Sequence, residues 1–296
     1  MLSLRFVILL AILGTVWSLW PLPQTISEIG SSKLTLKSSF HFTVVGQENQ
    51  LASDRLNRGI SRYEQLIAVP QLSRQSANNS ISGCNILVSS VVDTDAEFAS
   101  LTLGVDESYT LSIGSSGDCT ITSATIWGAL YAMETFTQLL IRDTSTSTVV
   151  CGSIPVTISD HSRFTHRGML IDTSRHYLPM SELKRIVDTF PMSKFNVLHW
   201  HAVDAQSFPL NLPSAPQMAK GAYSPALVYT ADDLKTMVSY AADRGVRVMF
   251  EVDVPGHASS WQYGEPSIMA DCLKYYTNVN SKFICLFLSL IVLIFV

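Results

Sequence analysis

The sequence predicts an α/β fold built on parallel strands, preceded by a smaller α+β domain. Three short apolar runs begin at Gly168, Phe195 and Val246, and each ends in polar, ionisable residues. Two amphipathic helix patterns separate the three runs, which gives the order β-α-β-α-β. Nearly continuous apolar strands in this order are typical of parallel strands buried on both faces.

The N-terminal residues 1–20 have the features of a secretory signal peptide or an N-terminal anchor. Arg5 supplies a positive charge, and an unbroken apolar run follows from Phe6 to Leu13. The run is short for a membrane-spanning helix, and polar chain follows it. If the protein is exported, the sequon at Asn78 becomes a candidate N-glycosylation site.

The next region, residues 21–160, mixes helices and strands and is predicted to be an α+β domain. Apolar side chains fall on one helical face between Leu56 and Ile67, and a second helical pattern covers 129–139. Strand patterns comprise a buried run at 86–92 and an alternating run at 109–113, followed by a glycine-containing turn at 114–117. We place the domain boundary between residues 159 and 164.

Two helices are predicted between the apolar runs of the second region. Ser181 is the expected N-cap of the first helix, whose apolar positions are Leu183, Ile186, Val187 and Phe190. The second helix starts at Thr230, which has capping-box spacing with Asp233, and ends before Gly245.

Ionisable side chains follow all three apolar runs. In parallel α/β folds the functional groups gather at the carboxyl ends of the strands, so these side chains are expected to form one site. An arginine fork suits the vicinal hydroxyls of a sugar or an anion, and carboxylates and histidines suit hydroxyl recognition or proton transfer. The residues are Asp172, Arg175, His199, His201, Asp204, Glu251, Asp253 and His257.

Two alternatives exist for these residues. Buried carboxylates and histidines at strand ends can simply hold loops in place. His199 and His201 lie two apart on a strand and would point to the same side, as paired metal ligands do. Barrel metal sites also draw ligands from later strands, so we expect no metal and no other cofactor.

Long segments of the chain resemble the eukaryotic β-N-acetylhexosaminidases, which form glycoside hydrolase family 20. They are RGMLIDTSRHYLP, KFNVLHWHAVDAQSFPL, KGAYSPALVYTADDL and EVDVPGHASSW in the second region, and DESYTL and WGALYAMETFTQLL in the first. The resemblance implies an N-terminal α+β domain followed by a catalytic (β/α)8 TIM barrel. It also implies a hydrolase that removes terminal N-acetylglucosamine or N-acetylgalactosamine from glycans or glycolipids.

Against this family the chain is expected to contain an incomplete barrel, with strands 1–3 only, in residues 164–280. A complete barrel takes roughly 250 residues. The family's Asp-Glu pair, in a His-x-Gly-Gly-Asp-Glu motif, has no counterpart in the sequence. We therefore expect none of the family's catalytic residues in this chain and no activity of the chain alone. Residues 281–296 are interpreted as an unrelated apolar tail.

The resemblance assigns substrate-binding or supporting roles to three residues. Arg175 matches the arginine that holds the sugar 3- and 4-hydroxyls, Asp204 an aspartate that supports the site, and His257 a histidine near the catalytic acid. Many relatives have a second acidic residue after this aspartate, where this chain has Ala205.

Composition narrows the partners. A net charge of −4 and the lack of a basic stripe argue against nucleic acid. The expected partners are N-acetylhexosamine-terminated glycans or glycolipids, with membrane contact through the terminal apolar segments and a family-type dimer both left open.

Five cysteines leave at least one unpaired, and their pairing cannot be deduced. The expected location is the secretory pathway, ending in a lysosome or vacuole, at the cell surface or in secretions. The competing hypothesis is a membrane-attached remnant that binds glycans or a full-length subunit without catalysis.

Overall fold

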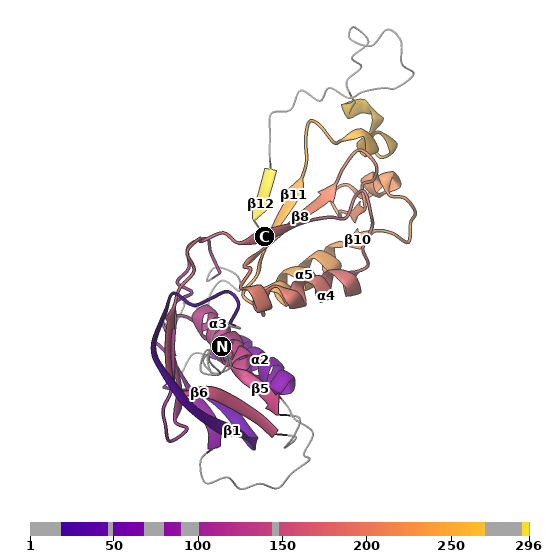
Figure 1. Cartoon of the computed structure of the whole chain (residues 1–296). Helices are drawn as coiled ribbons and strands as arrows, with labels where there is room; N and C mark the ends of the chain where they lie inside the picture. Colours follow the sequence, from indigo (N-terminus) through magenta and orange to yellow (C-terminus); the bar gives the residue numbers. More distant parts are fainter. Residues whose placement is uncertain are drawn as a thin grey trace, which may run out of the picture. The chain divides into compact units, whose positions relative to one another are not determined.

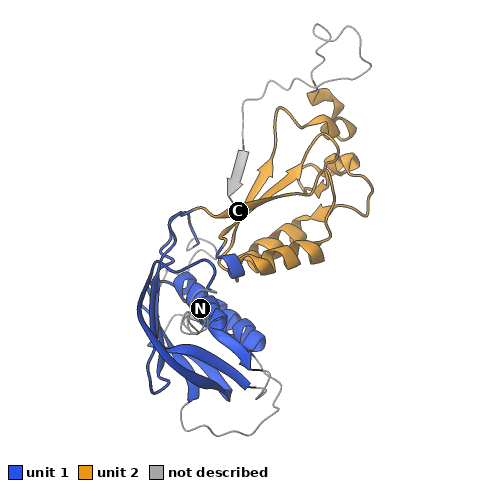
Figure 2. Ribbon diagram, viewed as in Figure 1, with its two compact units in different colours: residues 1–165, 191–194 blue, residues 166–190, 195–296 orange. Residues whose placement is uncertain are grey.

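The computed structural model describes residues 19–46, 50–67, 80–89, 101–143, 148–269 and 292–295. The chain divides into two compact units (Figure 2). Unit 1 comprises residues 1–165 together with 191–194, and unit 2 comprises the remainder. Asn78, Cys272, Cys285 and nearly all of the expected signal segment lie outside the described residues.

Unit 1 is a six-stranded sheet in the order β1-β2-β4-β3-β6-β5, with two helices on one face (Figure 1). The first strand pairs antiparallel with β6 through its N-terminal part and parallel with β2 through its C-terminal part. The elements are β1 (Thr25–Val45), α2 (Gln50–Ile67), β2 (Ser80–Val88), β3 (Tyr109–Ile113), β4 (Cys119–Ser123), α3 (Ile126–Gln138), β5 (Leu140–Asp143) and β6 (Thr148–Asp160).

The alternation predicted for β3 is present in the structure. Tyr109, Leu111 and Ile113 are buried, whereas Thr110 and Ser112 are only partly buried on the opposite face. Because successive strand residues point to opposite faces, the apolar set packs toward the helices. The predicted α+β character of this region is therefore seen in the fold.

The cysteine pairing that the sequence left open is resolved among the described residues. Cys84 and Cys119 are register partners on neighbouring strands β2 and β4, and they form a disulfide. Cys151 is free and buried, and burial raises the pKa of its thiol to about 12. A thiol with so high a pKa is not a reactive nucleophile at neutral pH.

Two residues of the expected signal segment belong structurally to unit 1. The Leu19 side chain is buried, and the backbone N–H of Trp20 donates to Gln138 Oε1 at 2.8 Å. In return, Gln138 Nε2 donates to the Trp20 carbonyl at 2.9 Å. These contacts tie the start of the described chain to the end of α3.

Unit 2 contains the predicted β-α-β-α-β order. Three adjacent parallel strands form its sheet, with two helices side by side on one face (Figure 1). A fourth strand pairs antiparallel with β11, and a short parallel pair, β9 and β10, lies apart from this sheet. The elements are β7 (Gly168–Asp172), α4 (Met180–Thr189), β8 (Val197–Val203), β9 (Leu210–Asn211), β10 (Tyr229–Thr230), α5 (Ala231–Ala242), β11 (Arg247–Val252) and β12 (Val292–Phe295).

The helix ends agree with the prediction in one helix and differ in the other. Thr230 and Asp233 form the predicted capping box of α5, and Gly245 has a positive φ of 72° just after the helix. The predicted N-cap of α4, Ser181, is wrong. That helix begins at Met180, Pro179 occupies the N-cap position, and no side chain caps the helix.

The prediction that the parallel strands are buried on both faces is also wrong for β7. Met169 and Leu170 are 42% and 52% exposed. In the part of the chain that the structure describes, β7 pairs only with β8 and is an edge strand. The central strand β8 is buried on both faces among the described residues: Leu198 and Trp200 belong to the core on the helix-facing side, and Val197 and Val203 are buried on the other.

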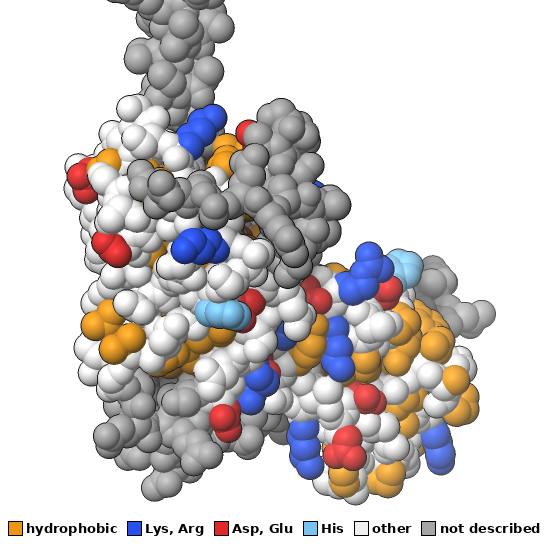
Figure 3. Space-filling model, turned by 90° about the horizontal axis from the view of Figure 1, so that it is seen from below, with side chains coloured by type: hydrophobic (Ala, Val, Ile, Leu, Met, Phe, Trp, Pro, Cys, Tyr) orange, Lys and Arg blue, Asp and Glu red, His pale blue; other side chains and the backbone are white. Residues whose placement is uncertain are grey.

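The described residues contain no helix that is both long and apolar enough to cross a membrane. Lys and Arg are interspersed with Asp and Glu on the face seen in Figure 3, without an extended patch of one sign among the residues drawn in colour.

Candidate functional site

The register of the unit 2 sheet places three ionisable residues side by side. Asp172 on β7 is the register partner of His201 on β8, which in turn is the partner of Glu251 on β11. Register partners point to the same face, so the three side chains form one row on the face opposite the helices. His199 lies two residues earlier on β8 and shares this face.

Asp172 and Arg175 are tied together by the turn that follows β7. One oxygen of Asp172 accepts the backbone N–H groups of Ser174 at 2.9 Å and Arg175 at 3.0 Å. The other accepts Arg175 Nη1 at 2.8 Å. Burial by itself would raise the pKa of Asp172, but these hydrogen bonds outweigh it and hold the pKa below the ordinary value.

Asp204 lies at the centre of the site. Its side chain is 1% exposed, and its Oδ2 atom lies 2.5 Å from Arg175 Nη2 and 2.9 Å from His201 Nε2. Its Oδ1 atom accepts the backbone N–H of Ala205. Burying a carboxylate this deeply costs free energy, which these hydrogen-bond and ion-pair partners offset.

The loop that holds Asp204 is fixed by hydroxyl groups. Ser260 Oγ donates to the Asp204 carbonyl at 2.6 Å. Ser174 Oγ donates to the Ser207 carbonyl at 2.7 Å, and the backbone N–H of Asp204 donates to that same carbonyl at 3.1 Å. Three segments far apart in sequence therefore meet beneath the site.

The segment after β11 contributes an Asp-His pair. His257 Nδ1 lies 2.5 Å from Asp253 Oδ2 and 3.7 Å from Asp204 Oδ2. The His257 side chain is 56% exposed, and its backbone has a φ of 53°. Positive φ is uncommon outside glycine, so the loop holds this imidazole in a specific position at the open side of the site.

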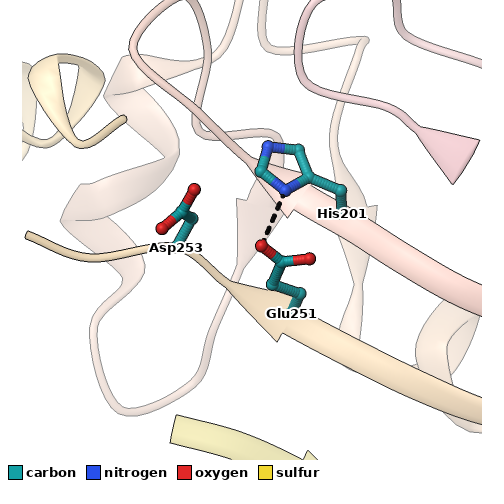
Figure 4. Close-up of side chains that lie close together, drawn as sticks. All are labelled: His201, Glu251 and Asp253. Carbon is teal, nitrogen blue, oxygen red and sulfur yellow. Dashed lines mark ion pairs between the residues drawn. The ribbon is translucent and has the colours of Figure 1, made fainter. Parts of the chain in front are cut away.

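His201 connects the β8 and β11 residues. Its Nδ1 atom lies 3.1 Å from Glu251 Oε1, and His199 Nε2 pairs with the second oxygen of Glu251. Figure 4 shows His201 and Glu251 facing one another from adjacent strands, with Asp253 just beyond the end of β11. All eight ionisable residues expected at the strand ends thus belong to one connected cluster.

The donor set of the cluster bears on the metal hypothesis. Two groups of described residues have ligand atoms close enough to share an ion: His201, Glu251 and Asp253, and Asp204, Asp253 and His257. The metal hypothesis expected His199 and His201 to be paired ligands, but neither group contains His199. Arg175 already lies 2.5 Å from Asp204, and a fixed guanidinium so near repels a second cation.

Arg175, Asp204 and His257 were singled out from the sequence, and all three meet around Asp204 Oδ2. The supporting contacts of Ser174 and Ser260 were missed. A serine gives no signal in one sequence, because its role depends on which loop it faces. Asn78, the expected glycosylation site, lies outside the described residues.

Comparison with known proteins identifies the class. The model of the catalytic domain of glycosyl hydrolase family 20 matches residues 164–288, and a model described as beta-acetyl hexosaminidase like matches residues 19–139. The chain belongs to glycoside hydrolase family 20.

Individual relatives agree with the family models. Beta-hexosaminidase 1 of Arabidopsis thaliana is 41% identical over 262 residues, covering 84% of this chain and 48% of the relative. Beta-hexosaminidase subunit alpha of Mus musculus is 38% identical over 278 residues, covering 91% of this chain and 51% of the relative. The chain therefore spans about half the length of the curated relatives it matches.

A solved structure gives the same result for the fold. The chitobiase of Flavobacterium johnsoniae superposes with a TM-score of 0.71 at 29% identity, covering 86% of this chain and 37% of that chain.

Proposed function

We propose that unit 2 forms the sugar-binding part of a β-N-acetylhexosaminidase active site, which hydrolyses terminal N-acetylglucosamine or N-acetylgalactosamine from glycoconjugates. The observation that carries the proposal is the position of Arg175. Its guanidinium is fixed by Asp172 and Asp204, yet the side chain is 38% exposed at the carboxyl edge of the strands. A planar fork held in this way presents its remaining donors to a pair of adjacent hydroxyls.

The other residues act around this arginine. Asp204 fixes the guanidinium from its buried side. The exposed His257, paired with Asp253, is placed to accept or hold a proton at its Nε2 atom, since its Nδ1 atom faces Asp253. Four carboxylates beside one arginine give the site an acidic character that suits a neutral, hydroxyl-rich ligand.

The proposed reaction is retaining and substrate-assisted, as in other enzymes of this family. There the acetamido oxygen of the substrate is the nucleophile, which departs from the usual scheme of two carboxylates. The glutamate that protonates the leaving group and the aspartate that orients the acetamido group come from a Gly-Gly-Asp-Glu motif. The sequence of this chain contains no such motif. We therefore expect these 296 residues to bind the sugar without hydrolysing a glycoside.

We also propose that the protein passes through the secretory pathway. The disulfide between Cys84 and Cys119 supports this, because such bonds persist in oxidising compartments. The apolar segments proposed for membrane contact lie almost wholly outside the described residues.

Calorimetric titration of the full chain with N-acetylglucosamine tests the central role of Arg175. A hydrogen bond from a charged donor is worth about 1.5–3 kcal/mol, so Arg175→Gln, which removes the guanidinium fork, should lower the affinity for the sugar by about tenfold or more. Arg185→Gln is the matched control, because Arg185 is an exposed arginine of the same unit whose ion pair is with Glu182 on α4, outside the cluster. Equal affinity of both variants would refute the proposal.

A further inference from the structure

The His201 imidazole lies between two carboxylates and has no part in the sugar contacts proposed above. Its Nδ1 atom is 3.1 Å from Glu251 Oε1, its Nε2 atom is 2.9 Å from Asp204 Oδ2, and its side chain is 6% exposed. An ionised carboxylate can only accept hydrogen bonds. Both contacts are therefore favourable only when each ring nitrogen carries a proton. A neutral ring would direct a lone pair at one of the two carboxylates.

On balance, the ionisable groups around His201 favour the same state, because the carboxylates outnumber the arginine. These groups come from all three parallel strands and from the segments that follow them. Four are acidic, one is the Arg175 guanidinium, and two are further imidazoles. They are Asp172 and Arg175 from β7 and the turn after it, His199 and Asp204 from β8 and its loop, and Glu251, Asp253 and His257 from β11 and the segment after it.

Burial and hydrogen bonding act in opposite directions on the pKa of His201. Burial by itself lowers the pKa of His201, but the hydrogen bonds with Asp204 and Glu251 outweigh burial, and the pKa is raised above 6.5. The ring therefore holds its second proton more tightly than an ordinary imidazole does, in a site whose carboxylates outnumber its arginine.

We propose that His201 is a positioning residue for sugar binding: as an imidazolium it fixes the Asp204 carboxylate, which in turn fixes the Arg175 guanidinium. A single oxygen connects the two side chains, since Asp204 Oδ2 lies 2.9 Å from His201 Nε2 and 2.5 Å from Arg175 Nη2. Glu251 acts one step further back by holding the opposite side of the ring. This inference rests on the proposed function, because it assigns the sugar to Arg175.

A dependence of sugar affinity on pH follows. The charged ring is present below its folded pKa and is lost as the pH rises through that value. Affinity for N-acetylglucosamine should therefore be highest under mildly acidic conditions and fall as the solution becomes alkaline. Replacing Glu251 by glutamine removes one of the two charges that stabilise the imidazolium. The fall in affinity should then begin at a lower pH.

The first test is a ¹⁵N NMR titration of the imidazoles in the full chain. We expect both nitrogens of His201 to carry protons at neutral pH and the midpoint to lie above 6.5. In Glu251→Gln the midpoint should fall by roughly one pH unit, the usual effect of losing a nearby opposite charge. A midpoint at or below 6.5 in the unaltered protein overturns the proposal, and this outcome does not depend on the folding of any variant.

The second test measures affinity for N-acetylglucosamine near pH 5 and near pH 7.5. Glu251→Gln should lose about tenfold at the higher pH, the equivalent of one pKa unit, and recover at the lower pH. Glu182→Gln is the control, because Glu182 lies on α4 and pairs with Arg185. An equal loss at both pH values would indicate a merely structural role for Glu251 and overturn the proposal.

The two proposals fail in different ways. If the unaltered chain binds no sugar at either pH, the proposed function is wrong and the positioning role falls with it. If the chain binds sugar while His201 is neutral, only the positioning role is wrong.

Discussion

Each of the two units holds a buried aspartate beside a basic side chain, and the surroundings of the two pairs differ. In unit 1, Lys194 Nζ lies 2.6 Å from Asp160 Oδ2, and the two side chains are 6% and 9% exposed. In unit 2, Asp204 is 1% exposed but its partner Arg175 is 38% exposed. An enclosed cation has its donors taken up by the protein, whereas an open one keeps donors for a ligand.

The contacts of the enclosed pair support this distinction. Lys194 Nζ also donates to Tyr109 Oη at 2.9 Å, and the other oxygen of Asp160 accepts the backbone N–H of Gln24 at 3.0 Å. Lys194 lies between α4 and β8 in sequence, yet it clusters with unit 1. The pair therefore holds residues 191–194 in unit 1, which is a structural role.

Breaking the enclosed pair should have the largest effect on stability. Lys194→Met leaves Asp160 charged and buried, which costs about 3–5 kcal/mol of unfolding free energy in comparable pairs. Urea denaturation measures the change. Lys235→Met is the control, because Lys235 is exposed on α5 and its removal should change stability by less than about 1 kcal/mol. Equal stability of the two variants would show that the pair does not hold the segment.

A smaller change separates loss of fold from loss of binding. Thr230→Ala removes the capping box of α5 and should cost about 1 kcal/mol of unfolding free energy. Sugar affinity should not change, because the Thr230 side chain hydrogen-bonds with Asp233, which is outside the cluster. Ser181→Ala should have almost no effect, since no side chain caps α4. A loss of affinity in Thr230→Ala would mean that any weakening of unit 2 weakens binding.

The smallest expected effect is the contribution of Asp172, in the strand-end cluster of unit 2, to the loss of folding stability in acid. The pKa of Asp172 is lowered in the fold, so its contribution to stability is present above the unfolded value, near 3.8, and is lost as the pH falls through the folded value. Asp172→Asn should therefore lose less stability between about pH 5 and pH 2 than the unaltered protein. Asp232→Asn, at an exposed position, is the control. Parallel stability curves for Asp172→Asn and the unaltered protein would contradict the assignment.

Much of the fold was predictable because it depends on local patterns. The i, i+3, i+4, i+7 spacing of apolar residues predicted α4, and the capping box predicted the start of α5. Ser181 was mistaken for a cap, whereas Pro179 occupies the N-cap position without a side-chain hydrogen bond. The disulfide between Cys84 and Cys119 depends on the pairing of β2 with β4, which the sequence does not reveal.

The site was predictable as a cluster but not in its connections. Parallel strands end at the same edge, which is why Arg175, Asp204 and His257 could be expected together. The row formed by Asp172, His201 and Glu251 depends on strand register. A shift of one residue would send these side chains to the opposite face. The enclosed role of Lys194 was likewise hidden, because it follows a helix in a loop that could lie anywhere on the surface.

The most direct test of the account is whether a sugar contacts the open guanidinium. In a ¹⁵N-labelled full chain, titration with N-acetylglucosamine should shift the side-chain NMR signal of Arg175 and leave that of Arg185 unchanged. Saturable shifts at Arg175 alone are the predicted result. Shifts at neither arginine, or equal shifts at both, would contradict the claim that the strand-end cluster of unit 2 is a sugar-binding site.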